Sequence, residues 1–191
     1  MTRFDIYTKI HKAIRAALFD AHVGLGRTDF TDAAEAEAFA GRLDRLCDFL
    51  DEHAAHEDEV LLPALAGVAP LLHADLRSDH ARLDGLQNEC RALADRLAGA
   101  GPAERAALGR RLHVELGRLV AAQLGHMERE EVEGHRALWA SFDDATLLAF
   151  HGRILAAIPG PRMAEWLALM LPTLNRSERA EVEAALAGAP A

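Results

Sequence analysis

Four long segments of the chain repeat apolar residues at the spacing of an α-helix, and this periodicity constrains the fold more than any other feature. The segments are residues 5–23, 32–66, 70–98 and 102–140, and the stretches that separate them are GLGRTDFTD, AGVAP and AGAGP. Apolar residues that recur every three or four positions line one face of a helix, whereas Gly, Pro and Asp mark its ends. Because short connections make consecutive helices antiparallel neighbours, the sequence predicts an all-α fold built on an antiparallel up-down-up-down four-helix bundle.

Two or three additional C-terminal helices are expected after the bundle. They correspond to DDATLLAFHGRILAAI, PRMAEWLALML and SERAEVEAALAG, which the PGP stretch at 159–161 and a short polar stretch divide. A chain of 191 residues with 50% hydrophobic residues is long and apolar enough for one full core. We therefore predict a four-helix bundle at residues 1–140 and a C-terminal helical extension, residues 141–191, that packs on its outside.

Charge and composition exclude several classes of partner. The net charge is -9 and no Lys/Arg cluster offsets it, which disfavours nucleic acid and anionic membranes. The N-terminal stretch is amphipathic rather than a secretory signal, and no run of about 18 uncharged apolar residues occurs. Cys47 and Cys90 form no C-x-x-C motif, so neither a disulfide framework nor a thiolate zinc site is expected. These features favour a cytoplasmic protein without a nucleic-acid or membrane partner; they do not indicate its oligomeric state.

Histidine interrupts the apolar stripe of every predicted long helix, and two stripes also carry a glutamate. The interruptions are His11 on the first helix, His53 and Glu57 on the second, His80 on the third, and His126 and Glu130 on the fourth. Residues four apart on a helix share a face, so each glutamate points inward with the histidine that precedes it. All six side chains are therefore expected inside the bundle.

The height of these residues along the helices predicts that they meet. At 1.5 Å per residue, Glu57 and His80 each lie roughly 17 Å from the turn near residue 68, and the same count places all six near the end that holds the N-terminus. Buried ionisable groups are costly unless a cation pairs with them. Four imidazoles and two carboxylates without thiolate suit iron, manganese or zinc, and each carboxylate could bridge two ions. We therefore predict a metal site.

The remaining polar residues near these stripes are assigned other environments. A lone inward histidine is more often a hydrogen-bonded core residue than a ligand, which is the alternative for each position taken singly. Tyr7 is expected to pack or to lie just behind the ligands, and Gln87 and Gln123 to hydrogen-bond near the site. Outside the site we place His22, His73, His113, His135 and His151. Off the stripe, towards the flanks or solvent, we place His56, Asp58 and Glu59, and we expect Glu128, Glu131 and Glu133 to form a solvated face.

The stretches HKAIR, HAAHEDEVLLPAL, DHARL and HMEREE together resemble the hemerythrin-like (HHE cation-binding) domain family, over roughly residues 5–140. The resemblance implies a four-helix bundle with a non-haem di-iron centre, and it places that centre on the same six residues as the stripes do. One departure concerns the second histidine that oxygen-carrying hemerythrins have one turn after the third-helix histidine. That position is Asp84 here, which could ligate, hydrogen-bond to a ligand or face elsewhere.

Three functions are compatible with such a centre. The leading hypothesis is a non-haem di-iron protein, with two irons per chain, that binds or senses a small ligand such as oxygen or nitric oxide, or iron itself. The alternatives are a di-iron oxidising enzyme that activates oxygen, and a structural metal site, perhaps zinc, in an interaction module. The histidine-rich set favours a binding protein over the carboxylate-rich Glu-x-x-His sites of oxygen-activating bundles.

Overall fold

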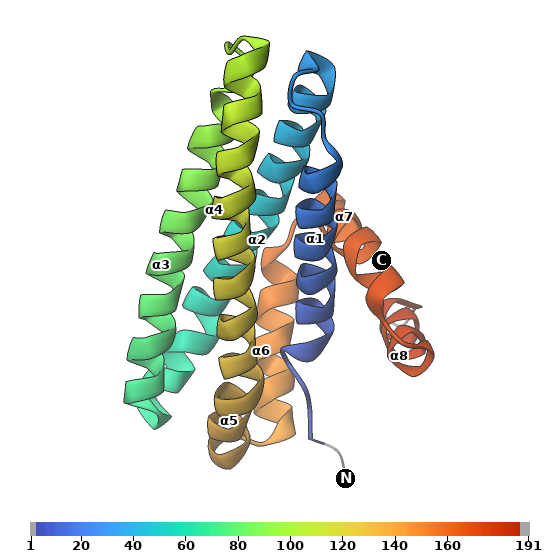
Figure 1. Cartoon of the computed structure of the whole chain (residues 1–191). Helices are drawn as coiled ribbons and strands as arrows, with labels where there is room; N and C mark the ends of the chain where they lie inside the picture. The colour runs from blue at the N-terminus through green and yellow to red at the C-terminus, as the bar shows by residue number, and fades with distance from the viewer. Residues whose placement is uncertain (1–2, 188–191) are drawn as a thin grey trace.

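The computed structural model describes residues 3–187, and its main feature is a bundle of four long antiparallel helices (Figure 1). The helices are α1 (Thr8–Arg27), α2 (Ala33–Val68), α3 (Pro70–Asp95) and α4 (Pro102–Arg129). The α1–α2 and α3–α4 connections lie at one end of the bundle, and the α2–α3 connection and the N-terminus lie at the other. No strand forms within residues 3–187, so the predicted all-α, up-down-up-down architecture is confirmed.

The helix starts follow from local chemistry that the sequence contains. The Asp32 side chain accepts hydrogen bonds from two backbone N–H groups in the first turn of α2, while Pro70 and Pro102 occupy the first positions of α3 and α4. Asp5 accepts a hydrogen bond of 2.8 Å from the backbone N–H of Thr8, so α1 begins at residue 8 rather than 5. The predicted end of α1 at residue 23 is wrong, because the helix continues through its glycines to Arg27.

The predicted continuous helix over 102–140 is also wrong. A π-helical turn, Glu130–Gly134, follows α4 and precedes α5 (His135–Ser141). A π turn inserts one extra residue, which shifts the face that later residues present. Gly134 and His135 are therefore both buried, and the ring of Tyr7 occupies the space beside Gly134, where an added Cβ would lie 3.3 Å from the ring.

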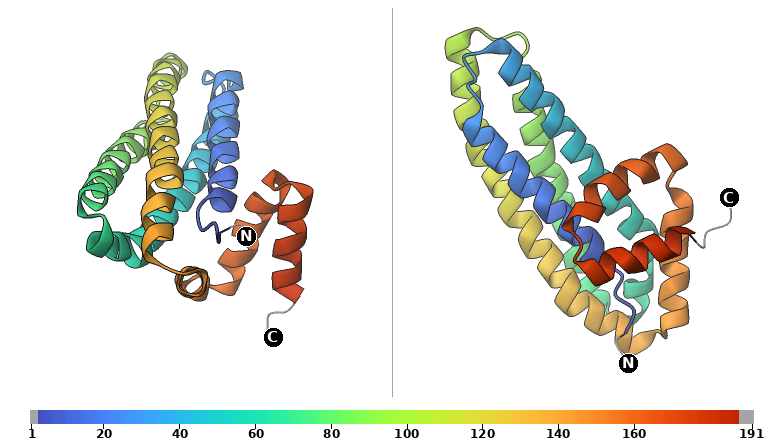
Figure 2. Two further views of the ribbon diagram at one scale, coloured as in Figure 1. Left: turned by 90° about the horizontal axis from the view of Figure 1, so that it is seen from below. Right: turned by 90° about the vertical axis from the view of Figure 1, so that its right-hand side faces the viewer.

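Three further helices cover one side of the bundle and one of its ends: α6 (Asp144–Ala157), α7 (Gly160–Met170) and α8 (Arg176–Ala187). Figure 2 shows α7 and α8 lying beside α1. The indole of Trp166 on α7 donates a hydrogen bond of 3.0 Å to Glu52 on α2, and Glu178 on α8 pairs with Lys12 on α1. In the described part of the chain no single helix is long and apolar enough to span a membrane; α6 and the segment Gly160–Thr173 reach that composition only together, across a bend of 116°.

Two clusters of buried apolar side chains fill the bundle, with polar residues between them. The larger cluster includes Ile14, Leu46 and Leu119, and the smaller one, towards the N-terminal end, includes Val60 and Leu138. On α2 and α3 the inward polar residues lie between residues of the two clusters. His11 follows Tyr7 of the smaller cluster and precedes Ile14 of the larger one, and Glu130 precedes Leu138 of the smaller cluster. The fold therefore encloses a polar layer between apolar layers.

Candidate metal centre

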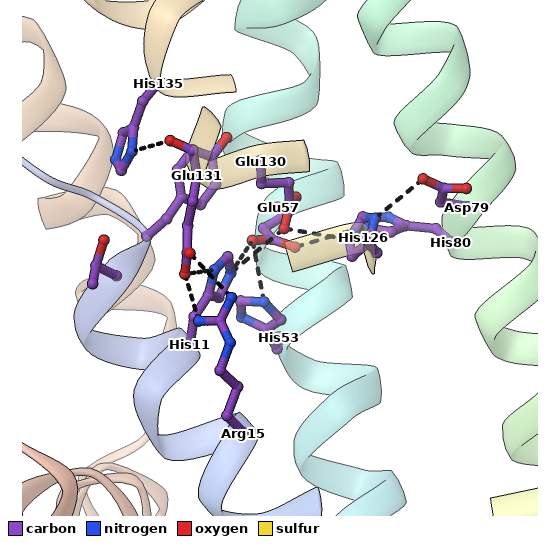
Figure 3. Close-up of polar contacts among 12 residues, drawn as sticks. His11, Arg15, His53, Glu57, Asp79, His80, His126, Glu130, Glu131 and His135 are labelled. Atoms are coloured by element: carbon purple, nitrogen blue, oxygen red, sulfur yellow. Dashed lines mark hydrogen bonds and ion pairs between the residues drawn. The ribbon is translucent and has the colours of Figure 1, made fainter. Parts of the chain in front are cut away.

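The four long helices and the π turn bring six polar side chains together in this layer (Figure 3). None of the six exposes more than 8% of its surface. Their nitrogen and oxygen atoms form two groups of four residues, and within each group these atoms lie within 4.8 Å of one another. The residues are the six predicted from the sequence: His11, His53, Glu57, His80, His126 and Glu130.

The first group lies between α1 and α2. Oε1 of Glu57 lies 3.2 Å from Nε2 of His53 and 3.7 Å from Nε2 of His11. Oε2 of Glu130 lies 3.4 Å from the same nitrogen of His11. Two donor atoms about 2.1 Å from one ion and at right angles lie roughly 3 Å apart, so these spacings suit a common cation.

The second group lies between α3 and α4. The Nε2 atoms of His80 and His126 are 3.1 Å apart. Oε2 of Glu57 lies 3.6 Å from His80, and Oε2 of Glu130 lies 3.3 Å from His126. Glu57 therefore directs one oxygen to each group, and Oε2 of Glu130 approaches both, so the two groups share these two carboxylates.

Most inward atoms of this layer lack a hydrogen bond. Nε2 of His11, Nε2 of His53 and both carboxylate oxygens of Glu57 and Glu130 are buried without a hydrogen-bond partner among the described residues. Buried polar atoms are nearly always paired, because an unpaired one loses its hydration without compensation. Metal cations bound among these atoms would give each of them an electrostatic partner in place of the lost hydration, so the residues present fit bound metal.

Carboxylates behind two of the histidines orient the imidazole rings. Nδ1 of His11 lies 2.9 Å from Oε1 of Glu131, and Nδ1 of His80 lies 2.8 Å from Oδ1 of Asp58. An Nδ1–H that donates to a carboxylate leaves the Nε2 lone pair facing the centre, as metal-ligating histidines require. Asp58 lies on the helix flank, as expected, but that flank faces His80.

Glu131 was expected on a solvated face, and that prediction is wrong. Arg15 reaches across from α1 and donates hydrogen bonds of 2.6 and 3.0 Å to the two oxygens of Glu131, which is half-buried. A similar pair lies behind His126. Arg129 donates a hydrogen bond of 2.9 Å to Asp79, and Oδ2 of Asp79 lies 3.7 Å from Nδ1 of His126. Glu131 and Asp79 adjoin Glu130 and His80 in the sequence, and this adjacency is the only signal that could have indicated them.

Burial and mutual charge set the protonation of the metal-free layer. Burial raises the pKa of Glu130, and the nearby charge of Glu57 raises it further. Burial also opposes ionisation of Glu57, but His53, His11 and His80 outweigh it and hold its pKa well below the ordinary range. Burial lowers the pKa of His53 to about 3 and that of His126 to about 4, so both rings are neutral at pH 7 and offer a lone pair.

Other residues considered from the sequence lie outside the two groups. His22 and His113 pack against each other with tilted rings whose centroids are 5.0 Å apart. His56 is half-buried elsewhere on α2, and Asp84 is exposed. His135 is a packing residue, 4.5 Å from the Trp139 ring between centroids. His73 and His151 likewise belong to neither group.

Tyr7 packs against the centre rather than within it. Its ring stacks on His11 at 5.5 Å between centroids, and its buried hydroxyl has no hydrogen-bond partner among residues 3–187. Burial raises the pKa of the phenol well above its usual value, and the charges of Glu130 and Glu57 raise it further. The hydroxyl therefore stays protonated at every physiological pH.

Comparison with known protein families gives one match, which covers the four-helix bundle. A family model described as the hemerythrin HHE cation binding domain matches residues 2–133. The matched range contains all six residues of the polar layer and none of α6, α7 or α8. No curated protein and no solved structure matches the chain.

Proposed function

The chain belongs to the hemerythrin HHE cation-binding domain family, and from this premise we propose that it is a non-haem di-iron protein that binds or senses a small ligand. One observation carries the proposal. Two adjacent groups of nitrogen and oxygen donors share Glu57 and Glu130, and the inward atoms of these residues have no other partner among the described residues. Oxygen and nitric oxide are the ligands that such a centre suits.

His11 and His53 would hold one ion, and His80 and His126 the other. Glu57 and Glu130 would lie between the two ions, because their oxygens approach both pairs of histidines. Nitrogen and oxygen donors without thiolate suit iron, with manganese or zinc as the competing ions. Six side chains offer fewer donors than two octahedral ions accept, which leaves room for an exogenous ligand.

Bound iron would supply redox chemistry and affinity for small molecules, and the protein supplies the surroundings. The apolar clusters on both sides of the layer exclude bulk water. Glu131 and Asp58 accept hydrogen bonds from the Nδ1–H groups of His11 and His80, which keeps both rings in the tautomer whose Nε2 lone pair faces inward.

We also propose that residues 1–140 form the metal-binding unit and that residues 141–191 brace it. The extension contacts α1 and α2 beside the first group of donors. Lys12, next to His11, pairs with Glu178 on α8, and Glu52, next to His53, accepts hydrogen bonds from Arg162 and Trp166 on α7. These contacts hold α1 and α2 at the spacing that the first group requires.

Metal analysis tests the proposed function. The full chain is reconstituted anaerobically with ferrous iron, and the expected content is about two ions per chain with an oxo-type charge-transfer band after exposure to air. Glu57→Ala should remove most of the metal, whereas the matched variant Glu59→Ala should keep it because Glu59 is exposed.

Metal content near zero with intact helical circular dichroism would refute the proposal. Retention by Glu57→Ala together with loss by Glu59→Ala would show that the assignment of faces is wrong. Uptake of zinc alone, without a charge-transfer band, would indicate a structural metal site instead.

A further inference from the structure

A small cavity lies against the second group of donors. Its volume is about 10 Å³, and its lining includes His80, His126, Leu50, Leu83, Gln87 and Gln123. A cavity of this size is close to the smallest that holds one water molecule. A larger hollow of about 270 Å³ lies around Arg91 on the surface between α2 and α3 and touches none of the six polar residues.

The two glutamines of the cavity wall are the only glutamines in the sequence. They expose 3% and 4% of their surface, although glutamine is usually a surface residue. The amide of Gln87 is satisfied when its nitrogen donates to Oδ1 of Asp51 at 3.1 Å and to the Cys47 carbonyl at 3.2 Å. Gln87 therefore contributes a fixed wall.

Gln123 has no such partner. It lies on α4 one turn before His126, and its side chain makes no hydrogen bond with any residue in the described range 3–187. The amide atoms are not fully enclosed, because Gln123 lines the cavity, so a polar molecule held there can pair with them. Two of the other lining residues, Leu50 and Leu83, are apolar and cannot supply that partner.

We propose that Gln123 is a ligand-binding residue whose amide hydrogen-bonds a water-sized polar ligand, of the class of water, hydroxide or fluoride, held in this cavity. The inference rests on the proposed function, because four of the six candidate metal ligands, His53, Glu57, His80 and His126, also line the cavity. Asp84, which is exposed and borders the cavity, gives it a polar rim towards solvent.

The amide also sets a preference between ligands. A small oxygen or fluoride ligand is a strong hydrogen-bond acceptor, and hydrogen bonds to charged groups are stronger than those between neutral groups. Nitric oxide is neutral and a poor acceptor, so it gains little from Gln123.

Fluoride titration of the metal-loaded full chain tests this inference. Isothermal titration calorimetry would compare the wild type with Gln123→Leu, which keeps the size of the side chain but removes the amide, and with Val114→Leu as a control at an exposed position of the same helix, outside the cavity. We expect Gln123→Leu to bind fluoride roughly 10- to 100-fold more weakly, and Val114→Leu to bind it with the affinity of the wild type. Nitric oxide affinity of the ferrous protein should be unchanged or higher in Gln123→Leu.

The outcomes separate the inference from the proposed function. Equal fluoride affinity in the wild type and Gln123→Leu, at full metal content, overturns the role of Gln123 and leaves the metal centre standing. A wild-type chain that takes up no metal overturns both. The metal-free proteins give a second measurement, because Gln123→Leu should leave the thermal midpoint unchanged or raise it. A fall of several degrees, or failure to fold, would show that the amide already has an internal partner and would also overturn the role.

Discussion

Replacing Glu131 with glutamine tests whether the residues behind the donors control metal binding. Glu131 accepts hydrogen bonds from Nδ1 of His11 at 2.9 Å and from Arg15 at 2.6 and 3.0 Å. Partial burial opposes its ionisation, but the hydrogen bonds from His11 and Arg15 outweigh burial and hold its pKa at about 2. Glutamine keeps the size of the side chain and removes the charge, so His11 loses the carboxylate that orients it and Arg15 loses its partner.

The substitution should lower both the free energy of unfolding and the metal affinity, by similar amounts. A pKa lowered from 4.5 to about 2 corresponds to about 3 kcal/mol, and because Glu131 exposes 22% of its side chain, solvent screening reduces this to about 1–2 kcal/mol. Loss of a carboxylate behind a metal-ligating histidine typically lowers metal affinity about 10- to 100-fold, or about 1.4–2.7 kcal/mol. Because the folded-state pKa is lowered, the contribution to stability is present above pH 4.5 and is lost as the pH falls towards 2.

Anaerobic competition with a chromophoric chelator measures the affinity of the wild type, Glu131→Gln and Glu133→Gln. Glu133 lies in the same π turn and is exposed, so its variant is the matched control for a lost negative charge. We expect weaker metal binding only for Glu131→Gln. Equal affinities in all three proteins would refute the role of Glu131, and equal losses in both variants would show that net charge alone is responsible.

Three further predictions concern the fold. Gly109→Ala should lower the free energy of unfolding by about 1–3 kcal/mol, since its Cβ would lie 2.3 Å from the Phe30 ring. Gly85→Ala should raise the free energy of unfolding by up to about 1 kcal/mol, because its Cβ would meet nothing within 4 Å. Urea denaturation that ranks the two variants in the reverse order would contradict this packing. Asp5→Ala should lower the free energy of unfolding by about 1 kcal/mol at pH 7, because Asp5 accepts a hydrogen bond at the start of α1. Since the pKa of Asp5 is lowered in the folded protein, this difference should shrink in thermal melts as the pH falls below 3.8. A difference that stays constant with pH would exclude a role for the charge of Asp5. Trp166→Ala should speed proteolysis near residues 159–161 while metal content stays intact, and unchanged proteolysis would show that Trp166 does not anchor α7.

Local patterns in the sequence were sufficient for the bundle and for the residues that face its centre. The apolar repeats and the breakers before Pro70 and Pro102 predicted the four long helices. The spacing of four between His53 and Glu57 predicted that both point inward, and the structure buries both. A helix has a fixed period and rise, so its own sequence states which residues share a face and how far along the axis they lie.

The surroundings of the centre depended on tertiary structure. Glu131 follows Glu130 directly and therefore points to a different side of the helix, so its own helix gives no reason for burial. It is half-buried because α1 packs against that flank and presents His11 and Arg15 to it. In the same way, the π turn before His135 and the isolation of Gln123 depend on which side chains the neighbouring helices place there. Periodicity within one helix contains no information on the rotation and offset of the next helix, and those two quantities decide which polar groups meet.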